Sequence, residues 1–142
     1  MTDEPISILI VDDSALYRQS IQNVMREIPG VSVVGVARNG VEALEKIRQL
    51  DPDLLTLDVQ MPDMDGIELL RAIKANGLRA AAIMVSSFTA EGAQVTTDAL
   101  MEGAFDFILK PSSTDSNQNR QQLRDALQHR IDAFRTSRVR GP

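Results

Sequence analysis

The chain has 142 residues, which fits one compact domain, and its 43% hydrophobic and 25% charged residues are ordinary for a globular protein. Its net charge of −5 gives general nucleic-acid binding no electrostatic support, and the absence of cysteine excludes disulfides and thiolate metal sites. The first residues are acidic and polar, unlike a signal peptide, and no apolar run approaches the ~20 residues that span a bilayer. We therefore expect a cytoplasmic protein that binds neither nucleic acid nor a membrane.

The first half of the chain alternates apolar runs typical of buried strands with helical spacings of apolar residues. In chain order, the pattern predicts a strand at 6–11, a helix at 14–28, a strand at 31–37, a helix at 41–50 and a strand at 54–57. Pro29-Gly30 and Asp51-Pro52 end the two helices, because proline lacks the backbone N–H that a helix needs and glycine favours non-helical conformations.

The second half continues the alternation and ends in a basic segment. It predicts a helix at 66–75, a strand at 80–85, a helix at 91–102, a strand at 105–109, a polar loop at 112–119 and a helix at 120–136. Residues 120–142 hold six arginines and two aspartates, whereas the rest of the chain is acidic. We expect one domain over residues 1–135, followed by a basic tail or the start of a linker over 136–142.

The predicted strands are continuous apolar runs rather than alternating ones, so both of their faces are expected to be buried. Such strands alternating with helices predict an α/β fold, in which helices cover both faces of a parallel sheet. In an open parallel sheet, ligands bind at the carboxyl ends of the strands. That edge is therefore where a functional site is expected.

Side chains that can do chemistry follow four of the predicted strands. They are Asp12 and Asp13 after the first strand, Asp58 after the third, Ser86 after the fourth and Lys110 after the fifth. Three converging carboxylates need a compensating charge, and Mg²⁺ prefers carboxylate and carbonyl oxygens. A cation, a lysine, a hydroxyl and a carboxylate together suit phosphoryl transfer, with Asp58 as the nucleophile that forms an acyl phosphate.

Each of these residues by itself also has a structural interpretation. Residues 13–14 can form only a strand-to-helix turn with an N-cap, and Asp58 can be a solvated loop acid. Their joint occurrence at the ends of several strands favours a site. The two other acids near Asp58 are interpreted as structural, since Asp65 and Glu68 have the spacing of a capping box and Asp63 follows a proline in a turn.

Two other kinds of site fit the same aspartates less well. An EF-hand calcium loop is excluded because its first and last ligand positions would be Met61 and Ala72. An aspartyl-phosphate phosphatase of the haloacid dehalogenase type needs a second aspartate two residues after the nucleophile, where this chain has Gln60. The phosphatase therefore remains the less favoured alternative.

Four motifs together resemble the receiver domain of two-component response regulators over about residues 5–135: ILIVDDS, LTLDVQMPDMDG, IMVSS and GAFDFILKP. The resemblance implies a flavodoxin-like, doubly wound (βα)5 fold with five parallel strands in the order 2-1-3-4-5. It also implies that a histidine kinase phosphorylates Asp58. The Mg²⁺ site is then formed by Asp12, Asp13, Asp58 and the backbone carbonyl of Gln60.

The same resemblance assigns the residues that respond to phosphorylation. Ser86 is the switch hydroxyl, Phe107 is the switch aromatic, and Lys110 balances the charge of the phosphoryl group. The peptide bond between Lys110 and Pro111 is implied to be cis. Phosphorylation is expected to change the face formed by the fourth helix, fifth strand and fifth helix, and with it the binding of an output domain, a partner protein or a second copy of the chain.

Within that family, the segments TLDVQMPDMDG, MVSSFT and GAFDFILKPS are most similar to the receiver of the chemotaxis protein-glutamate methylesterase. The chain contains no Gly-x-Ser-x-Gly nucleophile elbow, so the catalytic residues of the methylesterase are not transferred to it. We predict a receiver without enzymatic activity of its own, forming the regulatory part of a methylesterase. A stand-alone single-domain receiver is the alternative.

Overall fold

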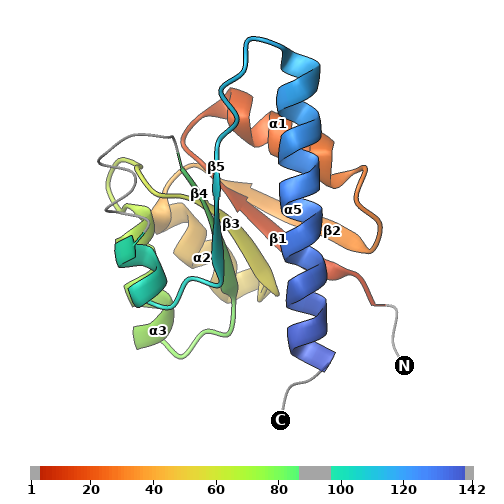
Figure 1. The fold of residues 1–142 in the computed structure, drawn as a ribbon. Helices are drawn as coiled ribbons and strands as arrows, with labels where there is room; N and C mark the ends of the chain where they lie inside the picture. Colours follow the sequence, from red (N-terminus) through yellow and green to blue (C-terminus); the bar gives the residue numbers. More distant parts are fainter. Residues whose placement is uncertain (1–3, 87–96, 140–142) are drawn as a thin grey trace.

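The computed structural model describes residues 4–86 and 97–139, in which five parallel strands form one sheet in the order β2-β1-β3-β4-β5 (Figure 1). The strands are β1 (Ile6–Val11), β2 (Val31–Ala37), β3 (Leu54–Asp58), β4 (Ala81–Ser86) and β5 (Asp106–Leu109). The helices are α1 (Ala15–Met25), α2 (Gly40–Leu50), α3 (Gly66–Ala75) and α5 (Ser116–Val139). Residues 97–101 are also helical, whereas the first part of the helix predicted at 91–102 lies outside the described residues. The predicted α/β fold and strand order are confirmed.

Helices cover both faces of the sheet, and each face has its own apolar core (Figure 1). On one face, Ile47 of α2 is buried in the same cluster as Leu57 of β3. On the other face, Ile21 of α1 and Leu127 of α5 are buried with Ile8 of β1. Successive residues of a strand point to opposite faces, which is why a strand covered on both sides reads as an uninterrupted apolar run.

Several helix boundaries differ from the prediction, among them the start of α5 and the end of α1. Helix α5 begins at Ser116 rather than at 120, because the Asp115 carboxylate accepts hydrogen bonds from the backbone N–H groups of Asn117 at 2.9 Å and Gln118 at 3.3 Å. Helix α1 ends at Met25 rather than at 28, and a tighter turn follows it. In both cases local hydrogen bonds determine where the helix begins or ends. The spacing of apolar residues carries no information about these hydrogen bonds.

The predicted cis bond between Lys110 and Pro111 is wrong, since the described residues contain no cis peptide bond. The trans form of a bond before proline is favoured by only ~0.5–1 kcal/mol, so the surrounding structure decides between the two forms. Here the backbone N–H of Lys110 donates to the carbonyl of Ser86 at 2.7 Å, which continues the pairing of β4 with β5 up to the proline.

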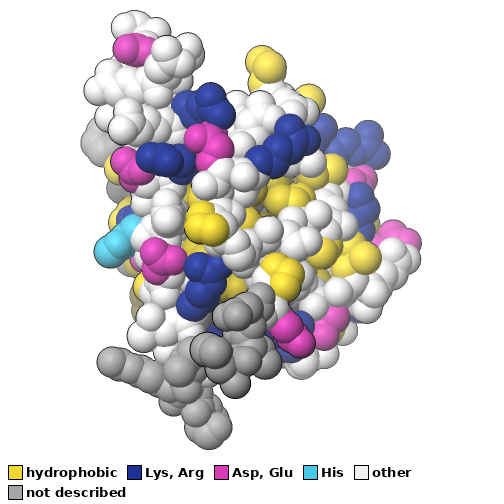
Figure 2. Space-filling view, turned by 90° about the vertical axis from the view of Figure 1, so that its right-hand side faces the viewer, with side chains coloured by type: hydrophobic (Ala, Val, Ile, Leu, Met, Phe, Trp, Pro, Cys, Tyr) yellow, Lys and Arg dark blue, Asp and Glu magenta, His cyan; other side chains and the backbone are white. Residues whose placement is uncertain are grey.

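The basic end of the chain is largely neutralised by nearby acids. The described arginines of α5 form the ion pairs Arg120–Glu27, Arg124–Asp125, Arg130–Asp106, Arg135–Asp132 and Arg138–Asp53. Figure 2 shows Lys and Arg side chains interspersed with Asp and Glu over the side of the molecule that lies to the right in Figure 1. This segment therefore presents a mixed-charge surface on that side rather than one continuous basic patch.

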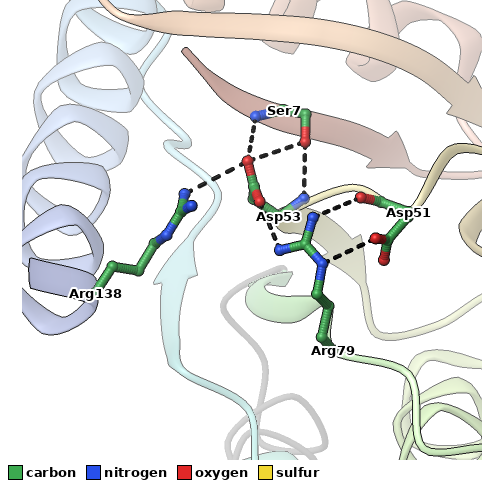
Figure 3. Close-up of polar contacts among 5 residues, drawn as sticks. All are labelled: Ser7, Asp51, Asp53, Arg79 and Arg138. Carbon is green, nitrogen blue, oxygen red and sulfur yellow. Dashed lines mark hydrogen bonds and ion pairs between the residues drawn. The ribbon is translucent and has the colours of Figure 1, made fainter. Parts of the chain in front are cut away.

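A polar cluster connects several elements at the edge of the sheet where the strands begin (Figure 3). Asp53 accepts hydrogen bonds from the backbone N–H and hydroxyl of Ser7, at 2.9 and 3.0 Å, and from Arg79 at 2.7 Å. Arg79 also donates to the carbonyl and carboxylate of Asp51, at 2.9 and 3.0 Å. Arg138 of α5 lies 3.4 Å from Asp53. The cluster joins the beginnings of β1, β3 and β4 to the last turns of α5.

Candidate functional site

The three predicted carboxylates meet at the carboxyl ends of neighbouring strands. Asp12 and Asp13 follow β1, Asp58 is the last residue of β3, and these two strands are paired. One carboxylate oxygen from each residue lies within 4.8 Å of the others, with Asp12 and Asp58 buried and Asp13 exposed. The parallel pairing of β1 with β3 therefore produces the acidic cluster, although the two parts are far apart in sequence.

Lys110 provides the positive charge of the site. It follows β5, and its side chain is 17% exposed. Its Nζ lies 3.3 Å from Oδ2 of Asp12 and 3.8 Å from Oδ1 of Asp58. The ammonium group thus lies close to both buried carboxylates.

Asp12 has one satisfied and one unsatisfied carboxylate oxygen. Oδ1 accepts a hydrogen bond from the backbone N–H of Ser14 at 2.9 Å, at the start of α1. Oδ2 is buried and makes no hydrogen bond within the part of the chain that the structure describes, and its close contact is the ion pair with Lys110. A buried carboxylate oxygen without a hydrogen bond, beside two further carboxylates, fits the ligand set of a hard cation such as Mg²⁺.

The environment of Asp58 disfavours its charged form. Burial raises the pKa of Asp58, as do the negative charges of Asp12 and Asp13, whereas Lys110 lowers it; together they bring the pKa to about 7. A bound cation would reverse this balance, because it favours the ionised carboxylate. Ionised Asp58 is therefore best stabilised by a positive charge additional to Lys110, such as a bound cation.

The loop after Asp58 is closed by its own hydrogen bonds. The backbone N–H of Gly66 donates to the carbonyl of Val59 at 2.9 Å. Asp65 and Glu68 form the predicted capping box of α3, with bonds of 2.9 and 3.1 Å. A Cβ on Gly66 would lie 2.6 Å from the carbonyl oxygen of Asp58, so the helix can approach this strand only with glycine there.

The other predicted residues lie around the acidic cluster at different depths. Ser86 is buried at the end of β4, and its carbonyl accepts the hydrogen bond from the Lys110 backbone. Gln60 is exposed in the loop after β3. Phe107 lies half-buried on β5. Its side chain packs against the apolar core under α2 and α3. Ser87, which follows Ser86 in the motif, lies outside the described residues.

The structure adds two residues that sequence reasoning missed. The Tyr17 ring centroid lies 4.2 Å from Nζ of Lys110, and burial together with the charges of Asp12 and Asp58 raises the pKa of Tyr17 to about 12. Arg18 donates to the backbone carbonyl of Asp12 at 2.7 Å. Both lie in the first turn of α1, which begins at the site. Their position in the sequence, shortly after Asp12 and Asp13, is the signal that could have identified them.

Comparison with known proteins agrees with this arrangement. The family described as the response regulator receiver domain matches residues 8–130. The chain belongs to this family. The match covers β1 from residue 8 onward, the four other strands and the whole acidic cluster of this receiver.

The curated relatives include protein-glutamate methylesterase/protein-glutamine glutaminases. The receiver is 44% identical to the one from Desulfotalea psychrophila over 134 residues, which are 94% of this chain and 37% of that protein. It is 51% identical to the one from Moorella thermoacetica over 112 residues, 79% of this chain and 26% of that protein. The receiver therefore spans between about a quarter and somewhat more than a third of the length of these relatives.

Solved structures show the same likeness. The response regulator domain of Thermotoga maritima CheB matches with a TM-score of 0.80 and 40% identity, covering 98% of this chain and all of that one. A chain of the CheX-CheY-BeF3-Mg+2 complex of Borrelia burgdorferi matches with a TM-score of 0.75 and 30% identity, and the match covers 92% of this chain and 89% of that chain. The predicted family, and the similarity to methylesterase receivers within it, are confirmed. Among the described residues, no helix has the length and apolarity needed to cross a bilayer.

Proposed function

We propose that Asp58 accepts a phosphoryl group from the phosphohistidine of a histidine kinase, and that the receiver thereby regulates a chemotaxis methylesterase. The observation that carries this proposal is the position of the Lys110 ammonium, 3.3 Å from Asp12 and 3.8 Å from Asp58, beside three convergent carboxylates. The similarity to protein-glutamate methylesterases supports the choice of output.

Asp12, Asp13, Asp58 and the backbone carbonyl of Gln60 would hold Mg²⁺. The unsatisfied Oδ2 of Asp12 and the exposure of Asp13 support this ligand set, and the similar Borrelia burgdorferi complex contains Mg²⁺ together with BeF3. When bound, Mg²⁺ supplies positive charge that offsets the oxygens of the transferred group.

The transfer itself is a displacement at phosphorus. A carboxylate oxygen of Asp58 forms the new O–P bond while the N–P bond of the phosphohistidine breaks, and the leaving imidazole takes a proton from solvent. Lys110 is close enough to Asp58 to bond an oxygen of the attached phosphoryl group. The buried position of Ser86, at the end of the neighbouring strand, supports its role as the hydroxyl that bonds another of these oxygens.

Signalling follows if phosphorylation changes the relative stability of two conformations. Ser86 and Phe107 are the proposed switch residues, and the responding face contains the helical residues 97–101, β5 and α5. An output domain, a partner protein or a second copy of the receiver must bind one of the two conformations better than the other, because only a difference in affinity shifts the equilibrium.

The test is phosphorylation by a small phosphodonor in the presence of Mg²⁺, followed by intact mass. We expect one phosphoryl group on the wild-type receiver and none on Asp58→Asn. The matched control is Asp63→Asn, which changes an exposed aspartate in the same loop whose φ of 68° asparagine tolerates. Stoichiometric labelling of Asp58→Asn that depends on Mg²⁺ would contradict the assignment.

A further inference from the structure

Tyr17 touches the site without belonging to the set of acids. We infer that Tyr17 is a positioning residue of the phosphorylation site, whose ring holds the Lys110 ammonium between Asp12 and Asp58. This inference rests on the proposed function and deepens it, because it adds a residue that acts through Lys110.

The Lys110 ammonium is enclosed by three groups. Asp12 lies 3.3 Å and Asp58 3.8 Å from Nζ, and the ring centroid of Tyr17 lies 4.2 Å from the same atom. A cation within ~6 Å of a ring centroid is attracted by the negative face of the ring. Tyr17 thus adds an attraction on the ammonium to those of the two carboxylates.

The position of the ring is determined by α1. The backbone N–H of Tyr17 donates to the hydroxyl of the N-cap, Ser14, at 3.2 Å. Ile21 and Val24 follow at helical spacing on the same face, and both are buried against the sheet. Tyr17 is therefore carried to Lys110 by a helix whose buried apolar face packs against the sheet.

Tyr17 also separates the ammonium from a hollow between α1 and α5. Tyr17 and Pro111 line this hollow, together with polar residues of both helices, whereas Lys110 does not. A lysine ammonium is compact, strongly hydrated and carried by a flexible chain of four carbons. The ring therefore limits both the rotamers of Lys110 and its access to water on that side.

The positioning role predicts different effects for two substitutions of Tyr17. Phenylalanine keeps the aromatic face that attracts the ammonium, and leucine keeps an apolar side chain but loses that face. A purely structural role, in which the residue only fills space beneath α5, predicts instead that leucine is tolerated about as well as phenylalanine.

The experiment measures the rate of phosphorylation by a small phosphodonor at saturating Mg²⁺. We expect Tyr17→Phe to react within about twofold of the wild type and Tyr17→Leu to react roughly 3- to 30-fold more slowly, the range that a cation–π contact supplies. Leu16→Ala is the matched control, since Leu16 is 83% exposed in the same helical turn, and its rate should not change. An unchanged rate for Tyr17→Leu, or an equal loss in Tyr17→Phe, would overturn the inference.

A double-mutant cycle with Lys110→Met separates positioning from packing. If Tyr17 acts through the ammonium, Tyr17→Leu slows the reaction no further once Lys110 is replaced. Additive losses in the double variant would indicate a packing role and contradict the inference. Thermal unfolding of each variant identifies losses that come from a destabilised fold.

A second readout does not depend on phosphorylation. The chain has three lysines, so the side-chain methylene signals of Lys110 can be assigned by NMR after replacement of each lysine in turn. We expect a ring-current shift of the Lys110 signals in the wild type and in Tyr17→Phe, and its loss in Tyr17→Leu. If the shift is present but the wild type accepts no phosphoryl group, the proposed function fails and the placement of Lys110 stands. If the shift is absent, the inference fails whatever the phosphorylation result.

Discussion

Replacement of Asp53 by asparagine tests whether the polar cluster at the beginning of the sheet stabilises the fold. Asp53 is 7% exposed and accepts hydrogen bonds through both carboxylate oxygens, from Ser7 on one side and Arg79 on the other. In Asp53→Asn one of these oxygens becomes an NH₂ group, which cannot accept a hydrogen bond. At least one donor at this buried position therefore loses its partner.

The expected loss follows from the exposure of the donors. A hydrogen bond to a charged group contributes about 1.5–3 kcal/mol. Arg79 and Arg138 are 53% and 47% exposed, so water replaces much of what they lose. We expect Asp53→Asn to lower the free energy of unfolding by about 2–3 kcal/mol, because the hydrogen bonds from Ser7 lose either their acceptor or its negative charge, and to lower Tm by roughly 5–10 °C.

The matched control is Asp51→Asn. Asp51 binds the same Arg79, but its side chain is 64% exposed, and asparagine tolerates its left-handed φ of 46°. This variant should lose no more than about 0.5 kcal/mol in urea-induced unfolding. Equal losses in Asp51→Asn and Asp53→Asn would refute the argument that burial makes the Asp53 contacts strong.

The pH dependence gives an independent check. Burial raises the pKa of Asp53, but the hydrogen bonds from Ser7 and Arg79 outweigh it and hold the pKa below its ordinary value of 3.8. A carboxyl group with a lowered pKa in the folded state stabilises the fold above its unfolded pKa, and that stabilisation is lost as the pH falls through the folded value. The stability difference between wild type and Asp53→Asn should therefore narrow below about pH 4. A difference that stays constant on acidification would show that the charge of Asp53 is not its source.

Three further substitutions test the region around the acidic cluster. Gly66→Ala should destabilise the fold by about 1–3 kcal/mol and slow phosphorylation, because its Cβ would lie only 2.6 Å from the carbonyl oxygen of Asp58; wild-type values in both assays would contradict this close approach of helix and strand. Asp58→Asn should stabilise the Mg²⁺-free protein above pH 7, on the order of 2–4 kcal/mol. The reason is that burial and Asp12 raise the folded pKa of Asp58 to about 7, so ionisation of Asp58 destabilises the fold as the pH rises. If Asp58→Asn stabilised the protein equally at about pH 4, this cause would be excluded. Asp65→Ala should cost about 1 kcal/mol by removing the cap that pairs with Glu68, measured by urea unfolding, and no loss would mean that water replaces the cap.

The elements could be predicted because their signals are local. Apolar runs and helical spacing identified the five strands, and three elements, β1, β2 and α3, have the predicted bounds. The capping box was also readable, since Asp65 and Glu68 interact within one turn. The start of α5 was missed because its cap lies in a polar segment that composition alone assigns to a loop.

The location of the candidate site could also be predicted, for a topological reason. Parallel strands all place their carboxyl ends on one edge, so acids after β1 and β3 and a lysine after β5 must approach one another. The cis bond before Pro111 came from the resemblance alone, and it was wrong because the isomer depends on packing that no motif specifies.

The sequence by itself determined the order of the elements, the parallel sheet and the residue types gathered at one of its edges, since these depend on spacing along the chain. Only the tertiary structure decided which groups touch. It placed Tyr17 over Lys110, joined Asp53 to arginines from two other segments, and buried Asp58 deeply enough to raise its pKa. The physical reason is that burial and electrostatic coupling depend on distances in space between segments, and those distances exist only once the helices have packed on the sheet.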